Sequence, residues 1–173
     1  MTTIPTQYAL DSNIFIEANR RYYAFDLCPG FWACVLHYHG ANRVRSIDRI
    51  QVELAKGTDK LADWVKDDTT RPIFYPSNTP DVLNWFGQMV TWVQSQTQFF
   101  DAAKAEFAAS ADSWLIAYAK ANNMTLVTHE EWNREARRRV PIPNVCRAFN
   151  VLYTDTFIML RDLAVSFAWN GVS

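Results

Sequence analysis

Three short segments of the chain carry acidic residues where a hydrophobic run meets a turn or the start of a helix. Their carboxylates belong to Asp11, Asp112, Glu130 and Glu131. Carboxylates that a fold gathers into one pocket repel one another unless a cation lies between them. A hard divalent cation, Mg²⁺ or Mn²⁺, is the natural occupant of such an oxygen-rich site. These residue types therefore predict metal-assisted hydrolysis.

The elements that must position these acids are strands alternating with helices. The expected strands cover residues 7–10, 125–128 and 151–153. Strands separated by helices form parallel sheets with helices on both faces, so the expected fold class is α/β. Functional residues in such folds collect at the carboxyl ends of strands. Asp11 and the segment 128–131 should share that edge, and Asp112 should approach it from a neighbouring loop.

Apolar spacing and capping residues predict the helices between these strands. Ser46 and Thr58 are expected N-caps, Val44 and Arg45 a connector or short strand, and the proline-containing stretch 71–80 a loop. The expected helices cover residues 13–25, 31–39, 47–56, 59–66, 81–107 (one helix or two), 112–122, 130–138, 144–149 and a last helix from Thr154 or Asp155 to about Trp169.

Length and composition favour one globular domain, residues 1–173, because 49% of the residues are hydrophobic and only 20% are charged. The net charge of -1 means that any contact with nucleic acid needs a local basic face. No apolar run reaches the roughly 20 residues of a membrane-spanning helix, and the N-terminus lacks the order of a signal peptide. The three cysteines form no C-x-x-C pair, which favours a reducing cytoplasm.

Taken in order, the acidic motifs resemble those of PIN-domain nucleases. The run YALDSNIFI at 8–16 is similar to the family's opening strand and helix, ADSWLIAYA at 111–119 to its third acidic motif, and TLVTHE at 125–130 to the strand and acid that follow. Residues 142–146 and 157–160 resemble its C-terminal strand and helix. The closest likeness is to a bacterial branch of unassigned function, often paired with helix-turn-helix regulators. The resemblance implies a three-layer α/β/α fold with a short central parallel sheet and many helices.

The same resemblance implies four metal-binding, catalytic acids: Asp11, Glu53, Asp112 and Glu130. Asp48 competes with Glu53 for the second position, but apolar neighbours suit Glu53 to partial burial. The family commonly has Asp where this chain has Glu130. That departure shifts the metal by one methylene and leaves Glu131 as a substitute or outer ligand.

Side chains beside the acids are expected to orient them. Ser12 and Thr128 would be supporting hydroxyls, and His129 would line the site. Each acid also has a purely structural interpretation. Asp112 could serve only as a helix N-cap, Glu130 and Glu131 could only favour a helix dipole, and Asp11 could only close a turn.

Arginines and an apolar stripe suggest partners. Arg134, Arg137, Arg138 and Arg139 follow the fourth motif and suit a phosphate backbone, although they could equally bind an acidic partner segment or form a solvated face. The stripe Trp85, Met89, Trp92 and Val93 could serve a homodimer or an antitoxin helix, with burial inside the domain as the alternative.

These inferences converge on a metal-dependent endoribonuclease. The resemblance implies the toxin of a bacterial toxin–antitoxin pair, an RNA substrate cut to a 5′-phosphate and a 3′-hydroxyl, and an antitoxin with a helix-turn-helix domain. A PIN-like scaffold that binds without cutting remains open because of Glu130. A structure-specific DNA nuclease also remains open, because the same acids could cut either polymer.

Overall fold

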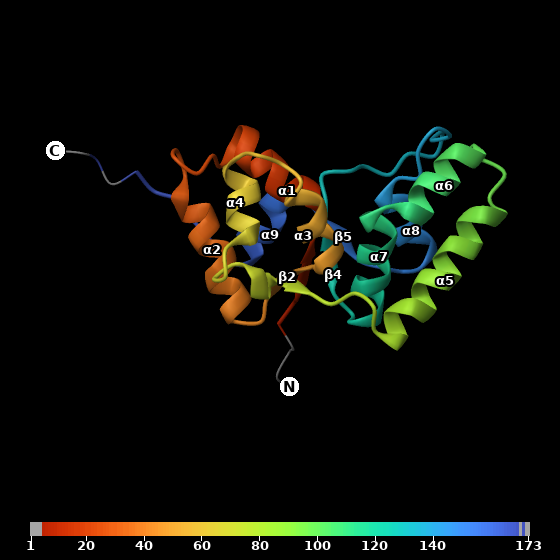
Figure 1. Ribbon diagram of the computed structural model, residues 1–173, viewed down its shortest axis with the longest axis horizontal. Coiled ribbons are helices and arrows are strands. Elements are labelled where there is room, and N and C mark those ends of the chain that lie inside the picture. Colours follow the sequence, from red (N-terminus) through yellow and green to blue (C-terminus); the bar gives the residue numbers. More distant parts are fainter. Residues whose placement is uncertain (1–4, 170, 172–173) are drawn as a thin grey trace.

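A computed structural model describes residues 5–169 and 171, and within it five parallel strands form one central sheet (Figure 1). The spatial order of the strands is β3-β2-β1-β4-β5. Their bounds are β1 Tyr8–Leu10, β2 Val44–Ile47, β3 Phe74–Tyr75, β4 Thr125–Val127 and β5 Tyr153–Thr154. All four pairings between neighbouring strands are parallel, as the alternation of strands and helices predicted.

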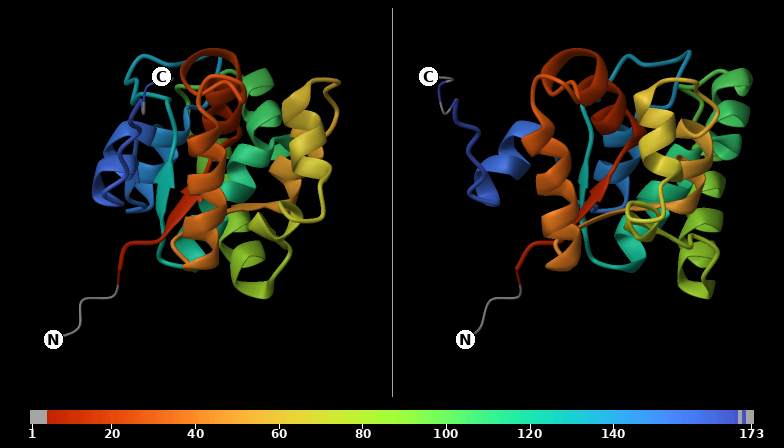
Figure 2. Two further views of the ribbon diagram at one scale, coloured as in Figure 1. Left: turned by 90° about the vertical axis from the view of Figure 1, so that its left-hand side faces the viewer. Right: turned by 60° about the vertical axis from the view of Figure 1, so that its left-hand side comes forward.

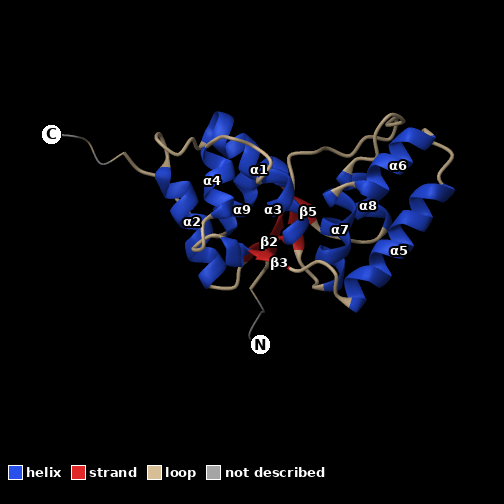
Figure 3. Cartoon of the chain, in the orientation of Figure 1, coloured by secondary structure: helices blue, strands red, loops and turns tan. Residues whose placement is uncertain are grey.

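Helices cover both sides of the sheet and form the outer layers. Figure 3 shows how short the strands are beside them. The α-helices are α1 Ser12–Glu17, α2 Pro29–Gly40, α3 Asp48–Leu54, α4 Lys60–Lys66, α5 Pro80–Ser95, α6 Asp101–Ala109, α7 Ala111–Ala121, α8 Ile142–Ala148 and α9 Thr156–Asp162. A π-helix, η1 Ala18–Tyr22, continues α1, and a 3-10 turn, η2 Arg71–Ile73, precedes β3. In Figure 1, α2, α4 and α9 lie left of the strands and α5 to α8 lie right of them. The three-layer α/β/α fold is therefore confirmed.

Asparagines make three of the turns from helix into strand. Asn42, Asn123 and Asn150 follow α2, α7 and α8, and each has a positive φ between 52° and 56°. Asparagine enters this left-handed region more readily than other non-glycine residues. Each turn ends its helix and sends the chain back into the parallel sheet.

The centre of the core is β1, whose Tyr8, Ala9 and Leu10 are all buried. Helix α7 contacts β1, β2 and β4, and it buries Leu115 and Ile116 fully. A strand covered on both faces must be apolar throughout. The first polar residue after such a run, here Asp11, therefore emerges at the sheet edge.

That edge is where the strands end together (Figure 2). Leu10 pairs with Val127, and Val127 pairs with Thr154, so the residues that follow β1, β4 and β5 emerge side by side. The backbone N–H of Asp11 donates to the carbonyl of Val127 at 3.0 Å. Asp11 and Thr128 thus share one edge of the sheet, as the strand pattern predicted.

Two local assignments near this edge are wrong. Ser46 is not an N-cap but a buried residue of β2, where its hydroxyl donates to the carbonyl of Leu10 at 2.7 Å. The stretch expected to be a loop contains β3, because Phe74 and Tyr75 pair with Ser46 and Ile47. Both errors arise because the deciding hydrogen bonds join residues distant in sequence.

The helix expected at 130–138 is also absent, since residues 128–141 contain neither helix nor strand. Hydrogen bonds to distant residues hold this segment instead. Asn133 and Asn144 exchange two of them, at 3.0 and 2.8 Å, and the amide of Gln98 donates to the carbonyls of Arg134 and Ala136.

Three further boundaries differ from expectation. Asp59, not Thr58, caps α4, because its carboxylate accepts a hydrogen bond from the backbone N–H of Ala62. The segment 142–146, which resembled a strand, lies in α8, and the last helix ends at Asp162 rather than near Trp169. Ala164, with a φ of 55°, turns the chain just after that helix.

The apolar stripe of α5 packs within the domain. Met89 and Val93 are fully buried. The rings of Trp85 and Trp92 pack edge-on against the ring of Phe149, with 6.5 and 5.9 Å between the ring centres. None of the helices described combines the length and apolarity that crossing a bilayer requires.

Candidate active site

Asp11 is the innermost acid of the site and is fully buried. It occupies the N-cap position of α1, yet its side chain makes no capping hydrogen bond, so a capping role does not explain it. Its Oδ2 accepts hydrogen bonds from Thr128 Oγ1 at 2.9 Å and from Asn13 Nδ2 at 3.3 Å, and its Oδ1 accepts from Ser12 Oγ at 3.4 Å. Ser12 and Thr128 therefore both contact the acid that they were expected to orient.

The electrostatics of Asp11 show that other acids are near. Burial, followed by the carboxylate of Asp112, raises the pKa of Asp11 to about 7. The hydrogen bond from Thr128 opposes this rise, and Glu130 adds to it. A buried carboxylate with two carboxylate neighbours is the environment that a divalent cation would stabilise.

Asp112 approaches from the first turn of α7. The N-cap of that helix is Ser110, so Asp112 is not a capping residue either. Burial raises the pKa of Asp112, Arg139 lowers it, and Glu106 raises it. The positive end of the helix dipole favours an anion at this position.

Glu53, from α3, completes one wall of an open cleft of about 800 Å³ that Asp112 also lines. Partial burial and then the carboxylate of Asp112 raise the pKa of Glu53, whereas a hydrogen bond with Ser12 lowers it. The side chain of Glu53 is thus electrostatically coupled to the acid of α7.

Asp48 lines the same cleft but is committed to structure. Its Oδ1 accepts from the Ser77 hydroxyl at 2.6 Å and from the backbone N–H groups of Ser77 and Arg49 at 3.2 and 2.9 Å. These bonds tie the start of α3 to the loop after β3. Of the two competitors for the second acid, Glu53 keeps the freer carboxylate.

Glu130 is held on three sides. Its backbone N–H donates to Thr128 Oγ1 at 3.1 Å, its Oε2 accepts from the N–H of Ile142 at 2.8 Å, and its Oε1 pairs with Arg139. Burial raises the pKa of Glu130, the bond from Ile142 and the charge of Arg139 lower it, and Asp112 raises it. The extra methylene of glutamate is thus used to reach across the loop to α8.

Arg139 joins two of the acids. Its Nη2 contacts Glu130 and lies 3.6 Å from Oδ2 of Asp112. One guanidinium therefore supplies positive charge to both carboxylates in this structure.

The donor set fits a hard divalent cation, because every candidate ligand is a carboxylate oxygen. Across residues 5–169 and 171, however, no group of three His, Cys, Asp or Glu side chains is already arranged to hold a metal ion. Convergence of these acids on one ion would require their side chains to move, and it would require Glu130 and Asp112 to share or release Arg139.

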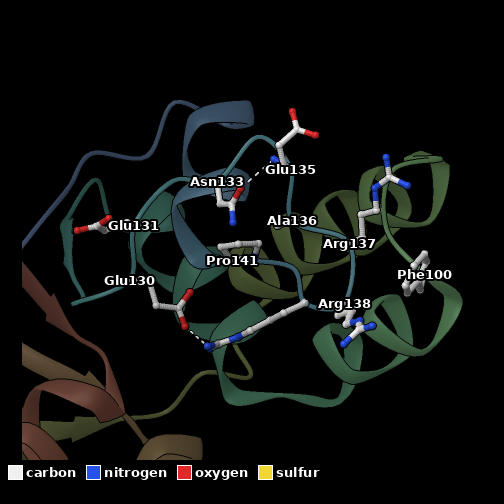
Figure 4. A pocket seen from close by; sticks show the side chains of 10 residues that line it. Phe100, Glu130, Glu131, Asn133, Glu135, Ala136, Arg137, Arg138 and Pro141 are labelled. Atoms are coloured by element: carbon white, nitrogen blue, oxygen red, sulfur yellow. Dashed lines mark hydrogen bonds and ion pairs between the residues drawn. The ribbon is translucent and has the colours of Figure 1, made fainter.

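A second cavity of about 700 Å³ adjoins the acids (Figure 4). Arg137, Arg138 and Phe100 lie on one side of it, and Glu130 and Glu131 lie on the other (Figure 4). This cavity brings together three of the four arginines singled out in the sequence, including Arg139. Arg134 is exposed and is not among its lining residues.

His129 and Glu131 point elsewhere. Nε2 of His129 lies 3.2 Å from the hydroxyl of Thr156, and its ring packs near Tyr22 and Phe157. Glu131 is exposed and lines the surface between the second cavity and this aromatic group. Neither side chain contributes a hydrogen bond to the acid cluster among the residues described.

Three charged residues near the acids, Glu106, Lys56 and Arg49, belong to none of the acidic sequence motifs. All three line the cleft, and the guanidinium of Arg49 lies 3.8 Å from the centre of the Trp114 ring. Glu106 belongs to α6, which carried no acidic motif. Glu106 reaches the cleft because α6 packs against α7, a contact that the sequence pattern does not predict.

Comparison with known families gives a direct assignment. Residues 8–167 match the family described as "Domain of unknown function (DUF4411)". The chain belongs to this family. No curated protein matches it.

Two solved structures share the fold of this chain. One is the crystal structure of VapBC2 from Rickettsia felis bound to a DNA fragment from their promoter, with 18% identity, a TM-score of 0.54, and coverage of 87% of this chain and 98% of that one. The other is FitAcB from Neisseria gonorrhoeae, with 14% identity, a TM-score of 0.50, and coverage of 85% and 96%. At these identities the likeness establishes the fold, which confirms the resemblance drawn from the motifs.

Proposed function

We propose that this chain is a divalent-metal-dependent endoribonuclease. The observation that carries the proposal is the environment of Asp11, a fully buried carboxylate whose pKa is raised to about 7 by burial and by the acids around it. Ionisation of a carboxylate buried beside other acids is unfavourable, and a bound divalent cation would offset this cost. Strand ends are also where α/β folds place their chemistry.

Asp11, Asp112, Glu53 and Glu130 would hold Mg²⁺ or Mn²⁺ through their carboxylate oxygens. When bound, the ion supplies Lewis-acid activation of the scissile phosphate and of an attacking water. Thr128 fixes the Oδ2 atom of Asp11. Glu53, which is exposed and lines the cleft, would orient or deprotonate water that enters from solvent.

The basic side chains around the acids suit the substrate backbone. Arg137 and Arg138 are exposed and line the second cavity with Glu130, and Lys56 and Arg49 line the cleft with Glu53 and Asp112. A phosphodiester chain that follows the two cavities would therefore meet cations as well as the acids. Phosphate contacts do not select RNA over DNA, so the choice of RNA as substrate follows the resemblance to PIN-domain nucleases.

The two structural neighbours support a toxin–antitoxin context. One is VapBC2 bound to a DNA fragment from their promoter, and the other is FitAcB. By this analogy the chain would pair with an antitoxin that carries a helix-turn-helix DNA-binding domain. The apolar stripe of α5 is largely packed inward, so it offers little to a homodimer.

One observation favours a second candidate function. Arg139 already pairs with both Glu130 and Asp112, which is how a scaffold that had lost its metal would stabilise its acids. A catalytically inactive binding module would keep this pairing permanently.

The proposed function is tested by offering the purified protein single-stranded RNA, single-stranded DNA and branched DNA of one sequence with Mn²⁺. Cleavage of RNA to ends with a 5′-phosphate and a 3′-hydroxyl supports the proposal. Preferential cutting of branched DNA would instead favour a structure-specific DNA nuclease. In a bacterial host, wild type should arrest growth and Asp11→Asn should not. Equal arrest at matched protein levels would favour the binding module.

A further inference from the structure

Arg139 occupies an unusual position for a substrate-binding arginine, because its guanidinium points at acids rather than at solvent. It contacts Glu130 and Asp112, which come from two separate elements of the site. It also lines both the acidic cleft and the neighbouring arginine-lined cavity. Arg139 therefore stands where the two cavities meet.

The backbone around Arg139 is held in place, whereas its side chain lies largely at the surface. Val140 is buried, and the carbonyl of Arg137 accepts a hydrogen bond from the N–H of Phe100 at 2.9 Å. The side chain of Arg139 nevertheless remains 56% exposed, while that of Glu130 is only 9% exposed. A rotation of one side chain, without movement of the loop, would uncover the two carboxylates.

We propose that Arg139 is a tethered counter-ion that competes with the divalent metal for Glu130 and Asp112. This inference rests on the proposed function, since it assumes that these carboxylates serve a metal. In the metal-free protein the guanidinium reduces the repulsion between the two acids. Metal binding then requires its displacement, because two cations cannot share the same carboxylate oxygens without repelling one another.

The displaced guanidinium of Arg139 would move into the neighbouring arginine-lined cavity. Arg137 and Arg138 already line the cavity beside it, and a substrate phosphate there would offer bidentate acceptors. Arg139 therefore couples the two events: metal entry frees the arginine, and the phosphate captures it. Substrate and metal should each strengthen the binding of the other.

The test compares Arg139→Gln with Arg138→Gln, which removes the same charge from the same loop but has no ion pair among residues 5–169 and 171. Calorimetric titration with Mn²⁺ measures affinity directly and needs no activity. Arg139→Gln should bind Mn²⁺ roughly tenfold more tightly than wild type, equivalent to about 1.4 kcal/mol. Arg138→Gln should differ from wild type by about twofold or less, as expected for a distant screened charge.

A second measurement separates this role from a merely structural one. Binding of a single-stranded RNA that carries phosphorothioate linkages is measured in Ca²⁺, a hard ion with little affinity for the sulfur of those linkages. Arg139→Gln should bind this RNA more weakly than wild type although it binds the metal more tightly. Loss of structure would weaken both, and circular dichroism of the variant reports that loss separately.

Equal Mn²⁺ affinity of wild type and Arg139→Gln would overturn the inference while leaving the proposed metal site intact. Weaker Mn²⁺ binding in Arg139→Gln would also overturn it. Failure of every variant to bind Mn²⁺ would overturn both the inference and the metal site on which it rests.

Discussion

The hydroxyl of Thr128 donates a 2.9 Å hydrogen bond to Oδ2 of Asp11, across 117 positions of sequence. The hydroxyl oxygen of Thr128 also accepts a hydrogen bond from the backbone N–H of Glu130, at 3.1 Å. One hydroxyl thus links the acid that follows β1 to the acid that follows β4. The parallel pairing of these two strands makes this link possible, because it brings their carboxyl ends to one place.

Replacement of Thr128 by valine should destabilise the protein by about 1–3 kcal/mol, because a buried carboxylate loses a donor and a backbone N–H loses its acceptor. Urea unfolding measures this change. Thr128→Ser keeps the hydroxyl and should recover most of the loss. Equal stabilities of the valine and serine variants would show that the hydroxyl does not hold the two acids.

The raised pKa of Asp11 predicts how the metal-free protein responds to pH. Unfolded Asp loses its proton near pH 4, whereas Asp11 in the folded protein retains its proton up to about pH 7. Between these values the folded state binds more protons than the unfolded state, so the free energy of unfolding should fall as pH rises. The raised pKa values of Asp112 and Glu130 act in the same direction.

Urea titrations in EDTA at pH 5 and pH 8 measure this loss of stability. Asp11→Asn should flatten the dependence, because asparagine does not titrate. The matched control is Asp63→Asn on the exposed face of α4, which should leave the dependence unchanged. A wild-type protein that gains stability over this range would contradict the assigned environment of Asp11.

Divalent metal should stabilise the folded protein, since a ligand bound only by the native state adds to the free energy of unfolding. At a concentration of 100 times Kd the gain is about 2.7 kcal/mol. Asp11→Asn should weaken the response of the melting temperature to Mg²⁺ and Mn²⁺. An unchanged wild-type melting temperature at millimolar concentrations of both ions would argue against tight metal binding.

Mutations of Glu53 and Asp48 should have different effects on activity and on stability. Glu53→Gln should lower the rate of RNA cleavage roughly 100-fold, about 2.7 kcal/mol of barrier, with little loss of stability. Asp48→Asn should instead cost about 1–2 kcal/mol of stability and retain most activity, because its carboxylate holds Ser77. Single-turnover cleavage and urea unfolding of both variants measure the two effects. The reverse pattern would make Asp48 the second acid.

Local patterns were sufficient for the features that depend on local sequence. The apolar run before Asp11 predicts a buried strand, and the parallel arrangement of strands then predicts the edge at which Asp11 and Thr128 meet. Residues 81–107 form one long amphipathic stretch, which predicts one helix or two. The structure has two helices, with the break at residues 96–100.

Features that depend on distant contacts could not be read from the sequence. Phe74 and Tyr75 form a strand only through pairing with β2. The segment after Glu130 has the composition of a weak helix, but hydrogen bonds from Gln98 and Asn144 to its backbone carbonyls hold it in an irregular conformation. The position of Arg139 between two acids follows from that open path. Its role among the acids therefore emerges only from the folded chain.

The most direct test of the account is the cleavage rate of single-stranded RNA as a function of Mn²⁺ concentration, for wild type and Asp112→Asn. Asp112 is chosen because it is coupled to Asp11, Glu53 and Glu130. The account predicts saturable, EDTA-sensitive cleavage by wild type and a loss of roughly 100-fold or more in the variant at every metal concentration. Equal cleavage by the two proteins, or wild-type cleavage that persists unchanged in EDTA, would contradict a metal-dependent nuclease built on these acids.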